Sequence, residues 1–354
     1  MKSRWTRWIW WAAAVLTAAM PLAGLAQPAA AGAPAVLALY EGADRLSRIA
    51  PAAKKEGSLL LYTTIAATSM EKIGADFEQR YGVKVNVWRA GTDKLMQRVL
   101  TEARSNRFDA DAIHFGSPEM EALHREKLLQ EVRSPHHRNL VQGAVPPHRS
   151  WAATYLNVYA LAYNTNKVRK EELPKTYQDL LEPRWRGRLG VEAKDQEWFL
   201  GIVKDMGEAR GLEYFRALVA ANGPSVRIGH TVLANMVVSG EVPLALTVFS
   251  YMPEQLKRKG APIDWFLLEP VVIRPNAIGV MRRAPHPNAA LLFYEYMLGE
   301  GQQLLSDMAY VPAARREESS LRNLRIRILD PVEVLDENDK WSRLYADVVT
   351  RQSR

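Results

Sequence analysis

Early in the chain, three stretches typical of a strand are each followed by a stretch typical of a helix. The apolar run 59–62, the alternating valines of 83–87 and the run 108–115 each precede a segment with apolar residues at helical spacing. Consecutive strand–helix units place their strands in parallel, cover the sheet with helices and gather the connecting loops at one edge. The sequence therefore predicts an α/β protein.

The later part of the chain adds a longer strand and further units of the same kind. Residues 151–163 have the composition of a strand and are long enough to pass between two lobes. Shorter strands are predicted at 189–191, 226–228, 243–249 and 265–282. Helices are predicted at 37–55, 70–81, 119–128, 196–207, 211–221 and 287–305, and a charged, partly helical tail at 320–354.

The N-terminus has the pattern of a secretory signal. Basic residues precede an apolar run at 9–19, and small residues follow up to Ala26. The apolar run is too short for a comfortable membrane span. We expect residues 1–26 to be a signal peptide cleaved near Ala26, and the Ala/Pro/Gly-rich residues 27–36 to be a disordered lead-in.

Composition excludes several classes of site. The chain has no Cys, which rules out disulfides, thiolate metal sites and Cys nucleophiles. An exported bacterial protein without Cys also lacks the usual attachment point for a lipid anchor, so we expect a protein that is free in its compartment. The net charge is +8, and the Lys and Arg residues are mixed with Asp and Glu rather than concentrated in one basic block. This distribution does not support nucleic-acid binding.

Motifs of catalysis and of metal binding are not evident. The chain has no Gly-x-Ser-x-Gly, His-Glu-x-x-His or P-loop pattern. His136, His137 and His148 lie in a Pro-rich loop without helical spacing or a carboxylate in register, so no metal site is predicted there. We expect neither an enzyme nor a bound cofactor.

The stretch 174–199 contains two different parts. Its first part, up to Arg188, is a turn-rich segment around Trp185, and it reads as an outer support of the fold. Its second part, Glu192 to Trp198, follows a short strand and begins a helix. Ligands bind at such strand-to-helix junctions in open α/β sheets. The alternative is a basic surface linker held by the Trp side chain.

Six stretches together carry a family resemblance. They are KEGSLLLY at 55–62, RAGT at 89–92, FDAD at 108–111, LAYNT at 161–165, PKTYQDLLEPRWRGRL at 174–189 and HPNAA at 286–290. In combination they resemble periplasmic solute-binding proteins of ABC importers, of the type II fold, in the branch that includes ferric-iron-binding proteins.

The resemblance implies a two-lobed α/β fold. It would have two mostly parallel sheets with helices on both faces, a hinge of crossing strands, and a cleft that closes on its ligand by hinge motion. Lobe 1 would comprise residues 37–150 and about 272–325, and lobe 2 residues 151–271 and about 326–354. A monomer of this kind would deliver its small-molecule ligand to an ABC permease in the inner membrane.

Ligand contacts are expected where strand ends and helix starts face the cleft, because they offer unpaired N–H groups and short hydroxyls. In the first lobe the candidates are Thr63, Thr64, Gly91, Thr92, His114, Gly116 and Ser117. In the second lobe they are Thr154, Glu192, Asp195, Trp198, His230, Thr231 and Tyr251. The alternatives are helix capping for the threonines and Asp195, a core position for Trp198 and a solvated loop position for His230.

The resemblance also bears on iron. Ferric-binding members use two adjacent tyrosines where this chain has Ser250 and Tyr251, and commonly a His where it has residues 65–67. Their acidic ligand falls near Gly116 and Ser117, which have no carboxylate. One phenolate cannot saturate an iron site, so the resemblance implies an organic solute, with ferric iron or an iron complex as the alternative.

The charge of the solute is left open by the residues. The acids within 192–197, beside aromatic rings, suit an amine through charge and cation–π contact. The first-lobe hydroxyls, with Arg89 or Arg274 as charge partner, suit a polar or anionic compound, which is the prediction we favour. The alternatives from other classes are an enzyme on the same fold, with His114 as acid or base, and a solute sensor for a membrane receptor.

Overall fold

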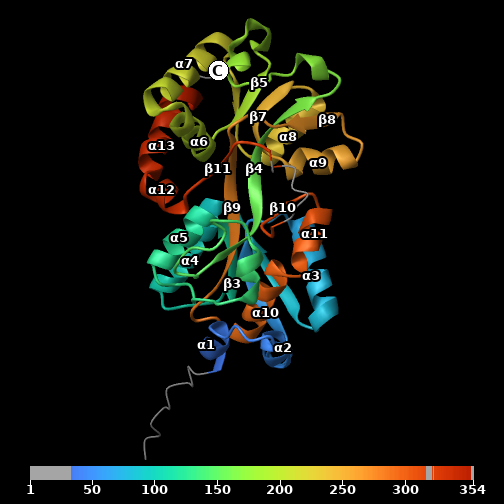
Figure 1. Cartoon of the computed structure of the whole chain (residues 1–354), viewed down its shortest axis with the longest axis vertical. Helices are drawn as coiled ribbons and strands as arrows, with labels where there is room; N and C mark the ends of the chain where they lie inside the picture. The colour runs from blue at the N-terminus through green and yellow to red at the C-terminus, as the bar shows by residue number, and fades with distance from the viewer. Residues whose placement is uncertain (1–32, 316–320, 322, 352–354) are drawn as a thin grey trace, which may run out of the picture.

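The computed structural model describes residues 33–315, 321 and 323–351, and the predicted signal peptide lies outside them. Figure 1 shows two α/β lobes stacked along the long axis of the molecule, as predicted. Strands β4 (Ala152–Asn164) and β9 (Val271–Val280) run from one lobe into the other. Within the described range, no helix combines the length and the apolar character needed to cross a membrane.

The first lobe is built from the three predicted strand–helix units. Its elements are β1 (Ser58–Thr63), α3 (Ala67–Tyr81), β2 (Lys84–Arg89), α4 (Thr92–Arg104), β3 (Ala112–Gly116) and α5 (Ser117–Arg125). β1 pairs in parallel with both β2 and β3. In α3 the predicted periodicity is confirmed, since Met70, Ile73 and Phe77 are buried and the helix ends at Gly82, whose φ of 65° suits glycine.

The lobes share one sheet because β4 and β9 pair with each other and with strands on both sides. The remaining strands are β5 (Leu189–Glu192), β6 (Ser225–Arg227), β7 (Leu244–Phe249), β8 (Ile263–Phe266), β10 (Val311–Pro312) and β11 (Ile326–Ile328). The order is β2-β1-β3-β9-β4-β7-β5-β6, with β8 and β10 also on β4 and β11 on β9. All 13 residues of β4 are buried, as expected for a strand covered on both faces.

Helices cover this sheet in both lobes, and the C-terminal part of the chain contributes helices first to one lobe and then to the other. They are α6 (Gln196–Met206), α7 (Glu208–Asn222), α8 (His230–Ser239), α9 (Tyr251–Arg258), α10 (Pro287–Leu298), α11 (Gly301–Asp307), α12 (Pro331–Asp336) and α13 (Asn338–Tyr345). Helices α10 and α11 pack into the first lobe, whereas α12, α13 and the π-helical turn Ala346–Thr350 lie on the second (Figure 1).

Two predicted helices are divided in the structure. The helix predicted at 37–55 is split into α1 (Ala33–Ala38) and α2 (Arg45–Glu56). The lead-in prediction is therefore wrong for residues 33–36, where an Ala-rich sequence with Pro in its first turn favours a helix. The helix predicted at 287–305 is broken at Gly299, whose φ of −107° and ψ of −105° are not helical.

One predicted strand is shorter than expected. The run 108–115 forms a strand only from Ala112 onward. The buried carboxylate of Asp111 accepts hydrogen bonds from the backbone N–H groups of Leu60 and His286, at 2.7 and 2.5 Å. Because this side chain is fixed by its own partners, the residues before it do not continue the strand ladder.

We propose the division into lobes at the predicted boundaries, residues 37–150 with 272–325 and residues 151–271 with 326–354. Two separate buried cores support it. One joins α2, α3 and α10, and the other joins α6, α7 and the C-terminal helix α13. One boundary falls just before β4 and another at the start of β9, the two strands that run through both lobes.

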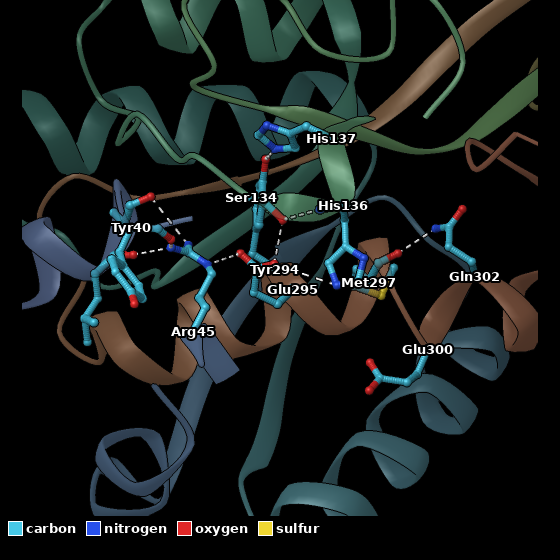
Figure 2. A network of polar contacts seen from close by, with 12 residues as sticks. Tyr40, Arg45, Ser134, His136, His137, Tyr294, Glu295, Met297, Glu300 and Gln302 are labelled. Carbon is cyan, nitrogen blue, oxygen red and sulfur yellow. Dashed lines mark hydrogen bonds and ion pairs between the residues drawn. The ribbon is translucent and has the colours of Figure 1, made fainter. Parts of the chain in front are cut away.

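A buried ion pair fixes the N-terminal helix α2 to α10 (Figure 2). The Arg45 Nε lies 2.8 Å from the Glu295 Oε1, and both side chains are almost fully buried. The second carboxylate oxygen of Glu295 accepts a hydrogen bond of 2.6 Å from the Ser134 hydroxyl. The guanidinium also donates to the carbonyl oxygens of Leu37 and Tyr40. Each charge is therefore satisfied on several sides, which a buried ion pair requires.

Replacing Glu295 with Ala should strand the buried Arg45 charge and lower the free energy of unfolding by about 3–5 kcal/mol. The control is Arg107→Ala, which removes an exposed ion pair with Asp109 and should change the free energy of unfolding far less. Urea unfolding followed by tryptophan fluorescence measures both. Equal, small losses in the two variants would contradict the stabilising role of the buried pair.

Candidate ligand site between the lobes

The candidate site lies where β4 and β9 pass between the lobes, together with the first turns of α5 and α6. We call this region the interlobe junction. In the strand register Arg274 lies opposite Asn157, and Asn276 opposite Tyr155 and Gly116. Residues opposite each other in a sheet point to the same face, so their side chains gather there. A bulge at Thr154 shifts the register at this point, as bulges often do beside functional sites.

Arg274 is the central charge of the junction. Its Nη2 lies 2.5 Å from the Glu119 Oε2 in the first turn of α5, and its Nε lies 2.9 Å from the Glu197 Oε2 in the first turn of α6. One guanidinium thus contacts a carboxylate from each lobe. Burial raises the pKa of Glu197, an effect that the positive charge of Arg274 opposes. Arg274 is therefore already neutralised, and of the two predicted partners for an anion only the exposed Arg89 lacks an ion pair among the described residues.

Gly116 has a steric role beside Arg274. A Cβ at this position would lie 2.1 Å from the Arg274 Nη2 and 2.5 Å from the Glu119 Oε2. A side chain at this position would displace the guanidinium or the carboxylate, so glycine leaves room for the ion pair in its present position. Gly116 was predicted as a ligand contact, and the structure places it where it makes room for the guanidinium.

Several buried polar atoms of the junction have no hydrogen-bond partner among the residues that the structure describes. They include His114 Nδ1, Ser117 Oγ, Asn157 Oδ1, Asp195 Oδ2 and Asn276 Oδ1. The Arg274 Nε and Glu197 Oε2, 2.9 Å apart, form an ion pair without hydrogen-bond geometry. A buried polar atom without a partner costs about 1–3 kcal/mol, so such atoms are rare and seldom cluster. Their concentration here indicates that a ligand or water completes the arrangement.

A series of aromatic rings, here called the aromatic arc, crosses the junction from His230 to His114. Successive centroid distances are 4.3, 6.2, 4.3, 4.7 and 5.6 Å along His230, Phe249, Tyr251, Tyr310, Tyr155 and His114. The hydroxyls of Tyr155 and Tyr251 have no hydrogen-bond partner in the described part of the chain. Burial raises the pKa of both phenols, so they stay neutral and can donate hydrogen bonds.

The second-lobe acids form a compact group. Glu192 accepts hydrogen bonds from the backbone N–H groups of Gly229 and Lys194, at 2.8 and 2.5 Å. The Asp195 Oδ1 lies 3.0 Å from the His230 Nε2. Burial lowers the pKa of His230, but the carboxylates of Asp195 and Glu192 outweigh it and raise the pKa overall. His230 is thus an ion-pair partner and not a solvated loop residue.

The other predicted contacts lie in or beside the junction in different ways. The Thr154 hydroxyl forms a hydrogen bond of 2.7 Å with the His114 Nε2. The Thr63 hydroxyl accepts a hydrogen bond from the backbone N–H of Ile65. Thr64 donates its N–H to the carbonyl of His114. Gly91 and Thr92 begin α4, and Thr231, in the first turn of α8, is exposed.

Trp198 is a core residue and not a ligand contact, which agrees with the alternative interpretation of this residue. It is 2% exposed and packs against Tyr177 and Phe215. Trp185 and Leu180 are buried in the same core, which supports the interpretation of the first part of 174–199 as a structural support. A residue in the first turn of a helix can point either way, and sequence spacing did not settle the direction.

The histidines of the Pro-rich loop do not form a shared site. His136 and His137 lie near Glu295 and Tyr294, whereas His148 pairs with Glu121 at 3.0 Å and stacks on His124. The His148 Nδ1 accepts from the N–H of Ser150, so its Nε2 carries the proton. That nitrogen has no lone pair for a metal in this arrangement.

A hollow of about 670 Å³ lies elsewhere on the first lobe. Its lining includes Glu41, His137, Arg138 and Arg149. None of the buried atoms without a partner belongs to its lining. The junction, and not the hollow, therefore has the unsatisfied groups expected of a ligand site.

His114 makes the fold sensitive to acid. Burial lowers its pKa to about 3, below the ordinary value of about 6.5. The folded state then binds fewer protons than the unfolded state, so stability falls as pH drops from 6.5 toward 3, by up to about 1.4 kcal/mol per pH unit. In His114→Gln the unfolding free energy should depend less on pH, and urea titrations at pH 7, 5.5 and 4.5 measure the difference. Parallel pH curves would show that His114 is not buried as described.

The chain is similar in sequence and in fold to known iron-uptake and iron-binding proteins. Iron uptake protein A1 of Synechocystis sp. is 24% identical over 276 residues, which cover 72% of this chain and 75% of that protein. The major ferric iron-binding protein of Neisseria gonorrhoeae is 25% identical over 243 residues, covering 65% and 72%. Iron-bound HitA from Pseudomonas aeruginosa has a TM-score of 0.70 at 24% identity, covering 82% of this chain and 99% of that one.

A second solved structure binds a different ligand. AfuA from Actinobacillus pleuropneumoniae, with fructose-6-phosphate bound, has a TM-score of 0.71 at 20% identity and covers 83% of this chain and 99% of that one. These two structures show the type II periplasmic-binding-protein fold. The family described as bacterial extracellular solute-binding protein matches residues 110–337. This match spans more than half of the sequence, and the chain belongs to that family.

Proposed function

We propose that this protein is the periplasmic solute-binding component of an ABC importer. It holds a small polar organic solute at the interlobe junction and delivers it, as a monomer, to a permease in the inner membrane. The observation that carries the proposal is the set of buried, unpartnered polar atoms from both lobes around Arg274. A solute bound there contacts both lobes at once, which couples its binding to lobe closure.

Contacts between the lobes support this arrangement. Lys194 of the second lobe lies 2.7 Å from Asp93 on α4, and Arg125 on α5 pairs with Asp336 on α12. These ion pairs are exposed and contribute little stability individually. They hold the lobes against each other loosely enough for a hinge motion to separate them.

Ferric iron is the second candidate. The names of the relatives favour it, and so does one observation: Tyr155 and Tyr251 both contact the ring of Tyr310 and have unpartnered hydroxyls. Against it, two carboxylates of the junction, those of Glu119 and Glu197, are bound to the Arg274 guanidinium and are not free to coordinate a metal. Two phenols alone do not saturate an iron site, so we favour an organic solute.

The proposed role is binding without catalysis. The buried imidazole of His114, whose Nδ1 is one of the unpartnered atoms, has a pKa of about 3, which makes it a poor base at neutral pH. Its Nε2 is also engaged with Thr154 at 2.7 Å. Conversion of the bound compound into a product would contradict this part of the proposal.

Native mass spectrometry of protein purified from its bacterial host tests the ligand. The expected result is one bound organic molecule, whose occupancy falls about tenfold or more in an Asn276→Leu, Tyr155→Phe variant that has lost two polar contacts. Arg138→Ala, in the hollow of the first lobe, is the control and should keep the bound mass. One equivalent of bound iron without an organic mass would overturn the proposal.

A further inference from the structure

We propose that the second-lobe end of the junction receives a positively charged group of the solute, a protonated amine, at the carboxylate of Asp195. We further propose that Glu192 enforces this choice by occupying the backbone donors that an anionic group would need. The inference rests on the proposed solute-binding function and specifies the chemical class of the solute.

Glu192 acts as an internal anion. It ends β5, and α6 and α8 both begin beside it, at Gln196 and His230. Helix N-termini with free N–H groups bind anions. Here the N–H groups of Gly229 and Lys194 both donate to the Glu192 carboxylate, at 2.8 and 2.5 Å. These two N–H groups, which precede the first turns of α6 and α8, are therefore not available to an external phosphate or carboxylate.

The backbone of Glu192 is fixed as well. Its N–H donates to the Thr247 hydroxyl at 3.1 Å, and its carbonyl accepts from the Tyr345 hydroxyl at 2.5 Å. The residue is 3% exposed. With its backbone fixed in this way, the Glu192 carboxylate cannot move aside for an anionic ligand without losing both of its own hydrogen bonds, from Gly229 and Lys194.

Asp195 offers the opposite kind of partner. It is 2% exposed, its Oδ1 is engaged with His230, and its Oδ2 has no hydrogen-bond partner within the described residues. A buried carboxylate oxygen without a donor is costly, and a charged donor is the strongest partner for it. An ammonium group supplies that donor. The unpartnered Asp195 oxygen is an observation separate from the balance of charges around it.

The local charge balance favours a cation. Four carboxylates surround the cations of the junction: Glu192, Asp195 and Glu197 of the second lobe, and Glu119 of the first lobe, which shares Arg274. The cations are Arg274 and His230, whose protonated form the neighbouring carboxylates favour. A third positive charge brings the group closer to neutrality. A negative group would add to the excess.

An amine fits this position better than a metal ion does. Glu192, Asp195 and His230 could present ligand atoms within 4.8 Å of one another. His230, however, donates its Nε2 proton to Asp195 and is favoured in the protonated form, which has no lone pair for a metal. Phe249 stacks on His230 at 4.3 Å, and Tyr159 lies 5.0 Å from Phe249. Aromatic rings beside a carboxylate suit an ammonium group.

Thermal-shift and calorimetric titrations with matched probes test the inference. Putrescine is compared with succinate, and ethanolamine with glycolate. The amines should stabilise the wild-type protein and the acids should not. In Asp195→Asn the amine affinity should fall about tenfold or more, whereas the matched surface control Asp339→Asn should retain it.

Glu192→Ala is the reciprocal variant. It frees the N–H groups of Gly229 and Lys194, so it should bind inorganic phosphate, which the wild type should not. Circular dichroism checks that each variant is folded. If Glu192→Ala does not fold, the amine affinity of Asp195→Asn alone decides the test.

Three results would overturn the inference. They are a co-purified solute without a basic nitrogen, succinate or phosphate binding to the wild type that Asp195→Asn leaves unchanged, and stoichiometric Mn²⁺ binding that His230→Ala abolishes. Absence of any organic solute in the native mass spectrum would instead refute the proposed function itself. The two failures are thus distinguishable.

Discussion

The guanidinium of Arg274 is the interaction on which the arrangement of the lobes depends. It lies on β9, one of the two strands shared by the lobes, and contacts Glu119 on α5 and Glu197 on α6. Two partly buried carboxylates facing one another would repel strongly without a cation between them. Their shared partner turns this repulsion into a bridge between the lobes, and the space around the bridge contains the unpartnered polar atoms. The same charge therefore positions the lobes and shapes the site.

Much of the scaffold was predictable because it depends on local patterns. The alternation of apolar and polar residues in 83–87, the helical spacing from Met70 to Phe77 and the length of 151–163 each specify an element directly. The breaks were less visible. The predicted helix was carried across Gly299 and Gly301 because apolar residues resume at 304–305, and apolar periodicity reports burial and not backbone dihedral angles.

The sequence predicted where along the chain the site residues lie, but not which of their side chains face the junction. Strand ends and helix starts led to His114, Ser117, Asp195, His230 and Tyr251, which the structure brings to the junction. Tyr155 was missed because β4 is buried on both faces, so its sequence shows no alternation that would reveal which side chains face the junction. The Glu119–Arg274–Glu197 contact joins residues distant in sequence, and only the folded sheet brings them together.

The central claim is that Arg274 couples the two lobes. Because the chain has no Cys, spin labels can be placed at introduced cysteines alone, Gln97→Cys on α4 and Asn235→Cys on α8, both exposed positions. Double electron–electron resonance then measures the distance between the lobes. We predict one narrow distance distribution in the labelled protein and a broader, longer one when Arg274→Met is added. An unchanged distribution in the Arg274→Met variant would contradict the account.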